Sequence, residues 1–103
     1  MKSVLAQIKD TALQTLPKGS KVMLYGSQAR GTARPDSDWD LLILLDKAKI
    51  EQADYDNFVF PFTYLGWTIG KQIIPVVYTK KDWEEYSFMP FNQNVEQDKI
   101  QII

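Results

Sequence analysis

Cysteine and histidine are both absent from this chain of 103 residues. Without cysteine there is no disulfide and no thiolate zinc site. Without histidine there is no Ser-His-Asp triad, and the commonest transition-metal ligand is missing. Carboxylates are therefore the groups left to act as acid, base or metal ligand.

Long apolar runs and an excess of one charge are also absent. No run approaches the ~18 to 20 residues of a membrane-spanning helix. Polar residues follow Met1-Lys2-Ser3-Val4, where a signal peptide would place its apolar segment. We therefore expect a cytoplasmic protein with no membrane contact. The formal net charge is -1, so nothing in the charge balance indicates a direct nucleic-acid partner.

The composition of the chain is that of a packed globular protein. Hydrophobic residues make up 45% of it and charged residues 24%, which is usual for this class. A length of 103 residues suits one compact domain, so we expect residues 1–103 to form a single domain. The sequence shows no internal repeat and no linker.

Apolar periodicity and turn residues divide the chain into short elements. The run 41–45 is apolar throughout and suits a central strand covered on both faces. Pro75 removes a ladder donor, so its strand is expected at an edge or to be irregular. Ser3 and Thr79 are expected helix caps, and Pro61 is expected to kink or interrupt its helix. The pattern predicts helices over 3–16, 28–31, 51–70 and 80–87, strands over 21–25, 41–45 and 71–78, and a helical turn with an apolar end over 91–103.

A pair of aspartates carries the chemistry of the chain. Asp38-Trp39-Asp40 opens the apolar run 41–45. Side chains alternate along an extended segment, so Asp38 and Asp40 should face the same way, with Cβ atoms about 7 Å apart. Two such carboxylates can share one or two Mg²⁺ ions, which prefer oxygen ligands and keep sites for water and phosphates. Trp39, on the other face, is expected to pack in the core.

A glycine-serine turn, ten residues before the aspartates, offers a matching phosphate site. Gly26 has no Cβ to keep a phosphate from the backbone, and Ser27 offers a hydroxyl and an amide where a helical turn begins. If the two flanking strands are neighbours, the turn and the aspartates converge. Arg30 is either a further phosphate ligand or a structural ion-pair partner. Arg34 is expected to be solvated.

The segment from Gly26 to Leu41, with its pattern G-S-x10-D-x-D and its intervening Ala-Arg-Gly, resembles the signature of the minimal nucleotidyltransferases. These form a branch of the DNA polymerase β-like nucleotidyltransferase superfamily, and the resemblance extends over essentially the whole chain. It implies an α/β nucleotidyltransferase fold, with a small mixed β-sheet flanked by α-helices. It also implies Mg²⁺-dependent use of a nucleoside triphosphate such as ATP. A HEPN-domain toxin is the implied partner, which some family members adenylylate on a tyrosine.

The resemblance assigns roles to five residues. It makes Gly26, Ser27 and Arg30 nucleotide-binding residues, although the role of the arginine position is less defined in the family. It makes Asp38 and Asp40 catalytic residues that hold the metal. The reaction it implies is transfer of a nucleotide monophosphate, AMP from ATP, to a hydroxyl acceptor on a partner protein.

The chain departs from the family at a third acid. Active members commonly carry another carboxylate on a later strand, and aligning residues 73–84 with that strand puts Ile74 in its place. Isoleucine neither binds metal nor accepts a proton. Loss of a general base typically slows a reaction by 10² to 10⁴. Two hypotheses follow: an enzyme that activates its acceptor through the metal alone, or a catalytically reduced module that neutralises a HEPN toxin by binding it.

An aromatic-rich stretch bears on the second hypothesis. We expect most of its aromatic side chains to be buried, whereas exposure would favour an interaction surface. Its members are Tyr55, Phe58, Phe60, Phe62, Tyr64 and Trp67.

Overall fold

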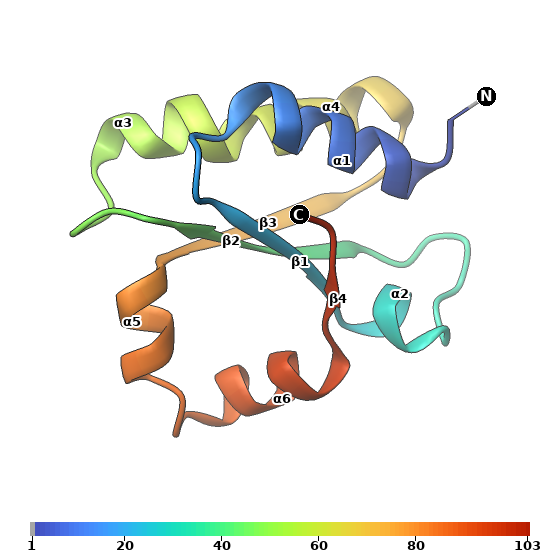
Figure 1. Cartoon of the computed structure of the whole chain (residues 1–103). Helices are drawn as coiled ribbons and strands as arrows, with labels where there is room; N and C mark the ends of the chain where they lie inside the picture. Colours follow the sequence, from blue (N-terminus) through green and yellow to red (C-terminus); the bar gives the residue numbers. More distant parts are fainter. Residues whose placement is uncertain (1) are drawn as a thin grey trace.

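A four-stranded mixed sheet forms the centre of the computed structural model, which describes residues 2–103 (Figure 1). The strand order is β3-β2-β1-β4; β1 is antiparallel to both its neighbours, and β2 is parallel to β3. The sheet confirms the predicted α/β class. The strands are β1 (Lys21–Tyr25), β2 (Trp39–Leu45), β3 (Ile73–Thr79) and β4 (Ile100–Gln101).

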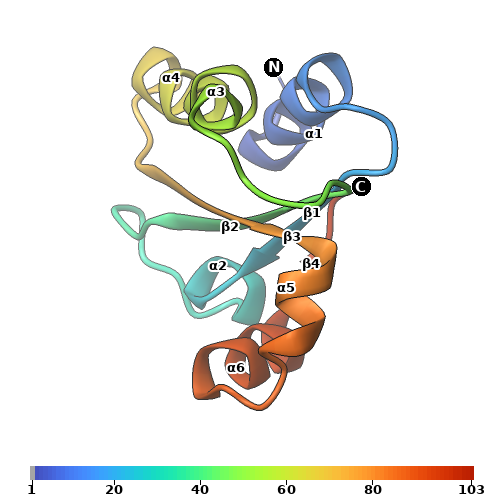
Figure 2. The same ribbon diagram turned by 90° about the vertical axis from the view of Figure 1, so that its left-hand side faces the viewer.

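Helices cover both faces of the sheet. In Figure 2, α1, α3 and α4 lie on one side of the strands, and α2, α5 and α6 lie on the other. Within residues 2–103, none of these helices has the length and apolarity to cross a bilayer. The helical segments are α1 (Val4–Thr15), α2 (Ser27–Arg30), α3 (Gln52–Asp54), the π-helical η1 (Tyr55–Val59), α4 (Phe60–Ile69), α5 (Lys80–Glu85) and α6 (Pro90–Asp98).

Strand alternation divides the buried side chains into two cores. β2 contributes to both cores and is therefore the covered central strand that its apolar run predicts. Asp40 has the same parity as Leu42 and Leu44, which places it on the α5 and α6 side. The core facing α1 and α4 comprises Ile8, Ala12, Val22, Leu24, Leu41, Ile43, Leu45, Phe62, Ile73 and Ile102. The core facing α5 and α6 comprises Met23, Leu42, Leu44, Trp83 and Val95.

The expected caps and the edge strand are confirmed. The Ser3 hydroxyl accepts a hydrogen bond from the Ala6 amide at 3.1 Å, and Thr79 Oγ1 accepts one from the Asp82 amide at 3.0 Å. β3 contains Pro75 and lies at the edge of the sheet.

The helix expected over 51–70 is interrupted near Pro61, as predicted. It consists of α3, η1 and α4, and η1 ends just before the first turn of α4, where Pro61 lies. Proline has no N–H to continue the α-helical ladder, and the wider π turn accommodates this. β4 was not predicted from the sequence; it has 2 residues and pairs with β1, far away in the chain.

The prediction that the aromatic stretch is mostly buried is wrong. Phe62 is fully buried, but Phe60, Tyr64 and Trp67 are exposed, as is Tyr55. The spacing i, i+4, i+7 puts Phe60, Tyr64 and Trp67 on one face of α4, away from the face on which Phe62 and Gly66 are buried. The Phe60 ring centroid lies 6.2 Å from that of Tyr64 and 5.6 Å from that of Trp67. We call Phe60, Tyr64 and Trp67 the α4 aromatic stripe.

Candidate functional site

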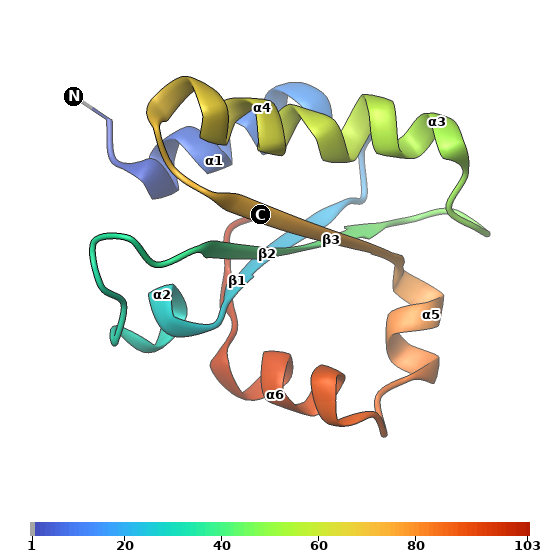
Figure 3. The ribbon, with the colours of Figure 1, turned by 180° about the vertical axis from the view of Figure 1, so that it is seen from behind.

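The pairing of β1 with β2 brings the two sequence motifs into contact. Tyr25 is opposite Asp40 in the antiparallel register, and Gly26 follows Tyr25 directly. A Cβ atom at Gly26 would lie 2.4 Å from Asp40 Oδ2, closer than two such atoms can approach. The glycine turn and the aspartate carboxylate therefore form one corner, as the spacing predicts. In Figure 3 this corner lies where α2 follows β1.

The conformation of Gly26 explains why glycine occupies this position. Its φ of 76° lies in the region that side chains with a Cβ rarely adopt. The chain turns there, and α2 begins at Ser27, with the Ala29 and Arg30 amides donating to the Gly26 carbonyl at 3.1 Å each. The first amides of a helix have no intrahelical acceptor, so the turn presents backbone donors beside the carboxylate.

The two aspartates carry negative charge that the chain does not neutralise well. Asp40 is half-buried and Asp38 is exposed. Burial raises the pKa of Asp40, the neighbouring Asp38 raises this pKa further, and Arg30 lowers it. No side chain among residues 2–103 donates a hydrogen bond or forms an ion pair to either carboxylate. Such a pair of oxygen donors favours a bound cation.

Residues 2–103 supply no third acidic ligand to this pair. Within the part that the structure describes, no three His, Cys, Asp or Glu side chains converge as a metal site would require. The parallel register pairs Asp40 with Ile74, so an isoleucine lies on the neighbouring strand beside the aspartate. This is the position at which the sequence alignment placed it. A metal held here would take its remaining ligands from water and from a bound phosphate.

Arg30 forms an ion pair within the protein. Its Nη1 lies 2.7 Å from Asp98 Oδ2, which ties α2 to the end of α6. Half of the Arg30 side chain remains exposed, and its contact with a nucleotide stays a prediction. Arg34 is exposed, and Trp39 packs against the core on the α1 and α4 side, both as expected.

An aromatic cluster next to the corner was not found from the sequence. Tyr25 lies on the strand position opposite Asp40, and its ring meets the Phe91 ring edge to face, with centroids 5.6 Å apart. Burial, Asp40 and Tyr78 together raise the pKa of Tyr25 to about 12. Phe91 also meets Trp83, at 5.9 Å. Strand parity could have placed Tyr25 beside the site, but Phe91 comes from a distant helix that carries no motif.

A known protein family matches nearly the whole chain. A family model described as a nucleotidyltransferase domain matches residues 5–102. A bifunctional uridylyltransferase/uridylyl-removing enzyme from Pseudomonas entomophila (strain L48) is 42% identical over 57 residues, which is 55% of this chain. The chain is similar to only a small part of that enzyme, because the match spans 6% of its length.

Solved structures share the fold. The crystal structure of a toxin-antitoxin with AMP-PNP superposes with a TM-score of 0.71 at 18% identity, covering 98% of this chain and 73% of that one. The toxin-antitoxin MntA-HepT gives a TM-score of 0.62 at 15% identity, covering 96% of this chain and 68% of that one. A variant of that toxin-antitoxin gives 0.67 at 14% identity and covers 98% and 73%. At these identities the likeness establishes the mixed sheet and its helices as a shared fold.

Proposed function

The chain belongs to the nucleotidyltransferase domain family, and from this premise we propose that it transfers AMP from ATP to a hydroxyl group of an acceptor protein. The observation that carries the proposal is the corner where Gly26 touches the Asp40 carboxylate. ATP is the proposed donor because the similar toxin-antitoxin structure contains AMP-PNP. The acceptor is proposed to be a HEPN-domain toxin, because the similar structures are toxin-antitoxins.

In this proposal the corner residues hold the triphosphate and the metal. Gly26 allows the phosphates to approach the backbone, and Ser27 donates its amide and hydroxyl to them. Asp38 and Asp40 fit Mg²⁺ because they are neighbouring oxygen donors to which no cationic side chain of residues 2–103 forms an ion pair. The chemistry that bound Mg²⁺ supplies is polarisation of the phosphates and stabilisation of the leaving charge.

The reaction itself exchanges one phosphorus–oxygen bond for another. The acceptor oxygen bonds to the α-phosphorus while the bond to the pyrophosphate oxygen breaks. Ile74, which lies beside Asp40, cannot take the proton of the acceptor hydroxyl. That proton leaves to solvent, and we expect turnover to be slow for this reason.

A test of the function is label transfer from ATP carrying a labelled α-phosphate. The purified chain is incubated with Mg²⁺ and the protein encoded by the neighbouring gene. The double variant Asp38→Ala plus Asp40→Ala should transfer label at least about 10²-fold more slowly, because the metal and phosphates lose their anchor. Asp36→Ala, an exposed aspartate of the same loop, is the matched control and should transfer normally. Undiminished transfer by the double variant would contradict the proposal.

A second function is favoured by a separate observation, the exposed α4 aromatic stripe. A pocket of about 510 Å³ between α4 and β3 is lined by Trp67 and Ile74 among others, so the stripe is continuous with the edge of the site. Exposed aromatic side chains are enriched where proteins bind one another. The chain would then neutralise a toxin by covering it. In that case the double aspartate variant would still neutralise the toxin when the two are produced together, whereas the transfer mechanism predicts that neutralisation is lost.

A further inference from the structure

A second pocket opens on the same side of the sheet as Asp40. It has a volume of about 360 Å³ and lies between the end of β3 and the start of α6. This volume is in the range of pockets that hold small ligands. Aromatic side chains form most of its wall, and one amide side chain interrupts them. The lining residues are Tyr78, Tyr86, Met89, Phe91 and Asn92.

The pocket lies one nucleotide's length from the corner of Gly26 and Asp40. Ile74 pairs with Asp40, and Tyr78 pairs with Leu44, on the same face of the sheet. Four residues of β3 separate Ile74 from Tyr78, which is roughly 13 Å at ~3.3 Å per residue. This span suits a nucleotide with its phosphates at one end and its base at the other. Figure 3 shows α2 at one end of this face and α5 at the other, with α6 running between them.

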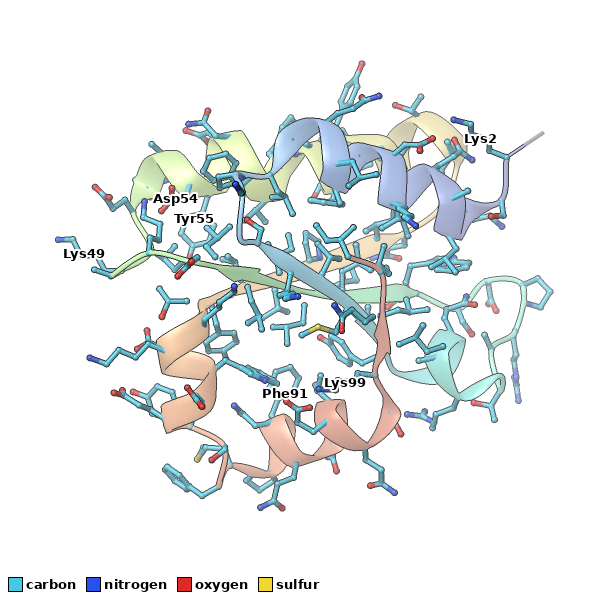
Figure 4. All side chains as sticks on the ribbon, in the orientation of Figure 1. Lys2, Lys49, Asp54, Tyr55, Phe91 and Lys99 are labelled. Atoms are coloured by element: carbon cyan, nitrogen blue, oxygen red, sulfur yellow. The ribbon has the colours of Figure 1, made fainter. Side chains whose placement is uncertain are left out.

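Aromatic contacts connect the corner to the pocket without a break. Tyr25 lies opposite Asp40, and its ring meets Phe91, which is part of the pocket wall. Figure 4 shows Phe91 on α6, below the sheet. Tyr25 is also within electrostatic range of both Asp40 and Tyr78, which together with burial raise its pKa. A ribose and base extending from the corner would therefore lie along aromatic surface.

Asn92 gives the pocket a fixed hydrogen-bond acceptor. The residue is 3% exposed, and its Nδ2 donates to the Trp83 carbonyl at 3.0 Å, which fixes the orientation of the amide. No donor among residues 2–103 bonds to Asn92 Oδ1. Every fully buried side-chain oxygen in that part of the chain has a hydrogen-bond partner, so Oδ1 is not fully buried. Oδ1 is therefore open to the pocket that Asn92 lines. An amide oxygen accepts from an exocyclic amine and cannot pair with a carbonyl.

We propose that this pocket binds the nucleobase of the donor nucleotide, and that Asn92 Oδ1 selects adenine by accepting from its exocyclic amine. The proposal rests on the proposed function, because the phosphates of the same nucleotide would occupy the corner of Gly26 and Asp40. Base stacking on Tyr86 and Phe91 contributes affinity, and the amide contributes selectivity.

Calorimetry with three ligands separates the two ends of the site. ATP, ITP and inorganic tripolyphosphate are titrated in Mg²⁺; ITP replaces the 6-amine of the base with a carbonyl. The wild type should bind ATP about tenfold more tightly than ITP, because ITP leaves the Asn92 oxygen facing another acceptor. In Asn92→Leu the two affinities should become equal, while the tripolyphosphate affinity stays unchanged.

The exposed Tyr86 provides a variant that does not disturb the core. Tyr86→Ala should weaken ATP and ITP alike by about tenfold, the size of a stacking contact. Tyr86→Phe keeps the ring and should bind as the wild type does. Asn92→Leu also removes the hydrogen bond from Asn92 Nδ2 to the Trp83 carbonyl and so can prevent folding. In that case the two Tyr86 variants test whether the pocket binds the base.

The outcomes distinguish failure of this inference from failure of the proposed function. If tripolyphosphate binds but ATP and ITP bind equally in the wild type, or if Tyr86→Ala binds ATP normally, the base pocket is wrong and the phosphate corner stands. If Tyr86→Ala instead weakens only the binding of a partner protein, the aromatic wall is a protein interface and the base pocket is again wrong. If neither ATP nor tripolyphosphate binds, both proposals are wrong.

Discussion

Gly26 and Gly31, at the two ends of α2, share a positive φ of 76° and 77°, but their ψ values of −159° and 18° place them in different backbone regions. Only at Gly26 would a Cβ meet another group, the Asp40 carboxylate; at Gly31 there is nothing within 4 Å. An alanine at Gly31, in the left-handed α region, should lower the free energy of unfolding by about 1–2 kcal/mol through backbone strain. An alanine at Gly26 should lower it by more, because the backbone region of Gly26 is essentially open to glycine alone. Gly26→Ala should also displace Asp40 and slow label transfer by about 10²-fold, because small misplacements at a reacting centre are costly. Thermal melts and transfer assays of both variants check this, and equal transfer by the two would contradict it.

At the residue scale, the sequence predicted contacts between residues that are close along the chain or that face each other across one pair of strands. The corner of Gly26 and Asp40 was predictable because a single antiparallel pairing of β1 and β2 creates it. The position of Ile74 beside Asp40 was predictable by alignment and agrees with the register. Asn92 was not predictable, because nothing in its neighbours indicates that α6 folds back beneath the sheet.

At the element scale, α3 begins with a charged cap that should make stability depend on pH. Asp54 is buried; its Oδ2 accepts from the Glu51 amide at 2.7 Å and lies 2.8 Å from Lys47 Nζ. The Lys47 hydrogen bond, followed by the Glu51 amide, holds the pKa of Asp54 below its ordinary value. The folded state therefore favours the ionised form, and this stabilisation is present above the unfolded pKa of about 3.9 and is lost as the pH falls through the folded pKa.

Asp54→Asn should accordingly be less stable than the wild type at neutral pH. The difference in unfolding free energy should be constant above about pH 5 and should shrink as the pH falls below about 4. Urea unfolding between pH 3 and pH 7 measures it. Asp56→Asn, at an exposed position of η1, controls for the change in charge. A difference for Asp54→Asn that is as large at pH 3 as at pH 7 would show that the carboxylate charge plays no part.

The boundaries of helices and strands were predictable where local chemistry determines them. Ser3 and Thr79 cap their helices through hydrogen bonds to amides three residues on, so the signal lies within one turn. The outward face of α4 was not predictable from composition, because an aromatic residue reads as core until the packing of its helix is known. The exposure of Trp67, at 68%, is a consequence of which face of α4 meets the sheet.

At the scale of the whole molecule, the last described residues complete both the sheet and a core. The Ile102 amide donates to the Val22 carbonyl at 2.8 Å, and its side chain is buried in the core on the α1 and α4 side. Ile100, two residues earlier, is 43% exposed. Ile102→Ala should lower the free energy of unfolding by about 2–4 kcal/mol, and Ile100→Ala by less than about 1 kcal/mol. Urea unfolding compares them, and similar losses would mean that the end of the chain does not contribute to the core.

The pairing of β4 with β1 also shows what sequence patterns miss at this scale. A strand of 2 residues has no periodicity to detect, and its partner lies near the beginning of the chain. The contact between β4 and β1 is formed only when the whole chain is folded.

β3 forms the open edge of the sheet and carries Pro75. Proline has no backbone N–H, so an edge strand that contains it lacks one of the hydrogen-bond donors that a strand from another molecule would need for pairing. The uncovered side of β3 is for this reason a poor template for sheet-to-sheet aggregation. An edge so near the aspartates can stay accessible to incoming molecules without recruiting further copies of the protein.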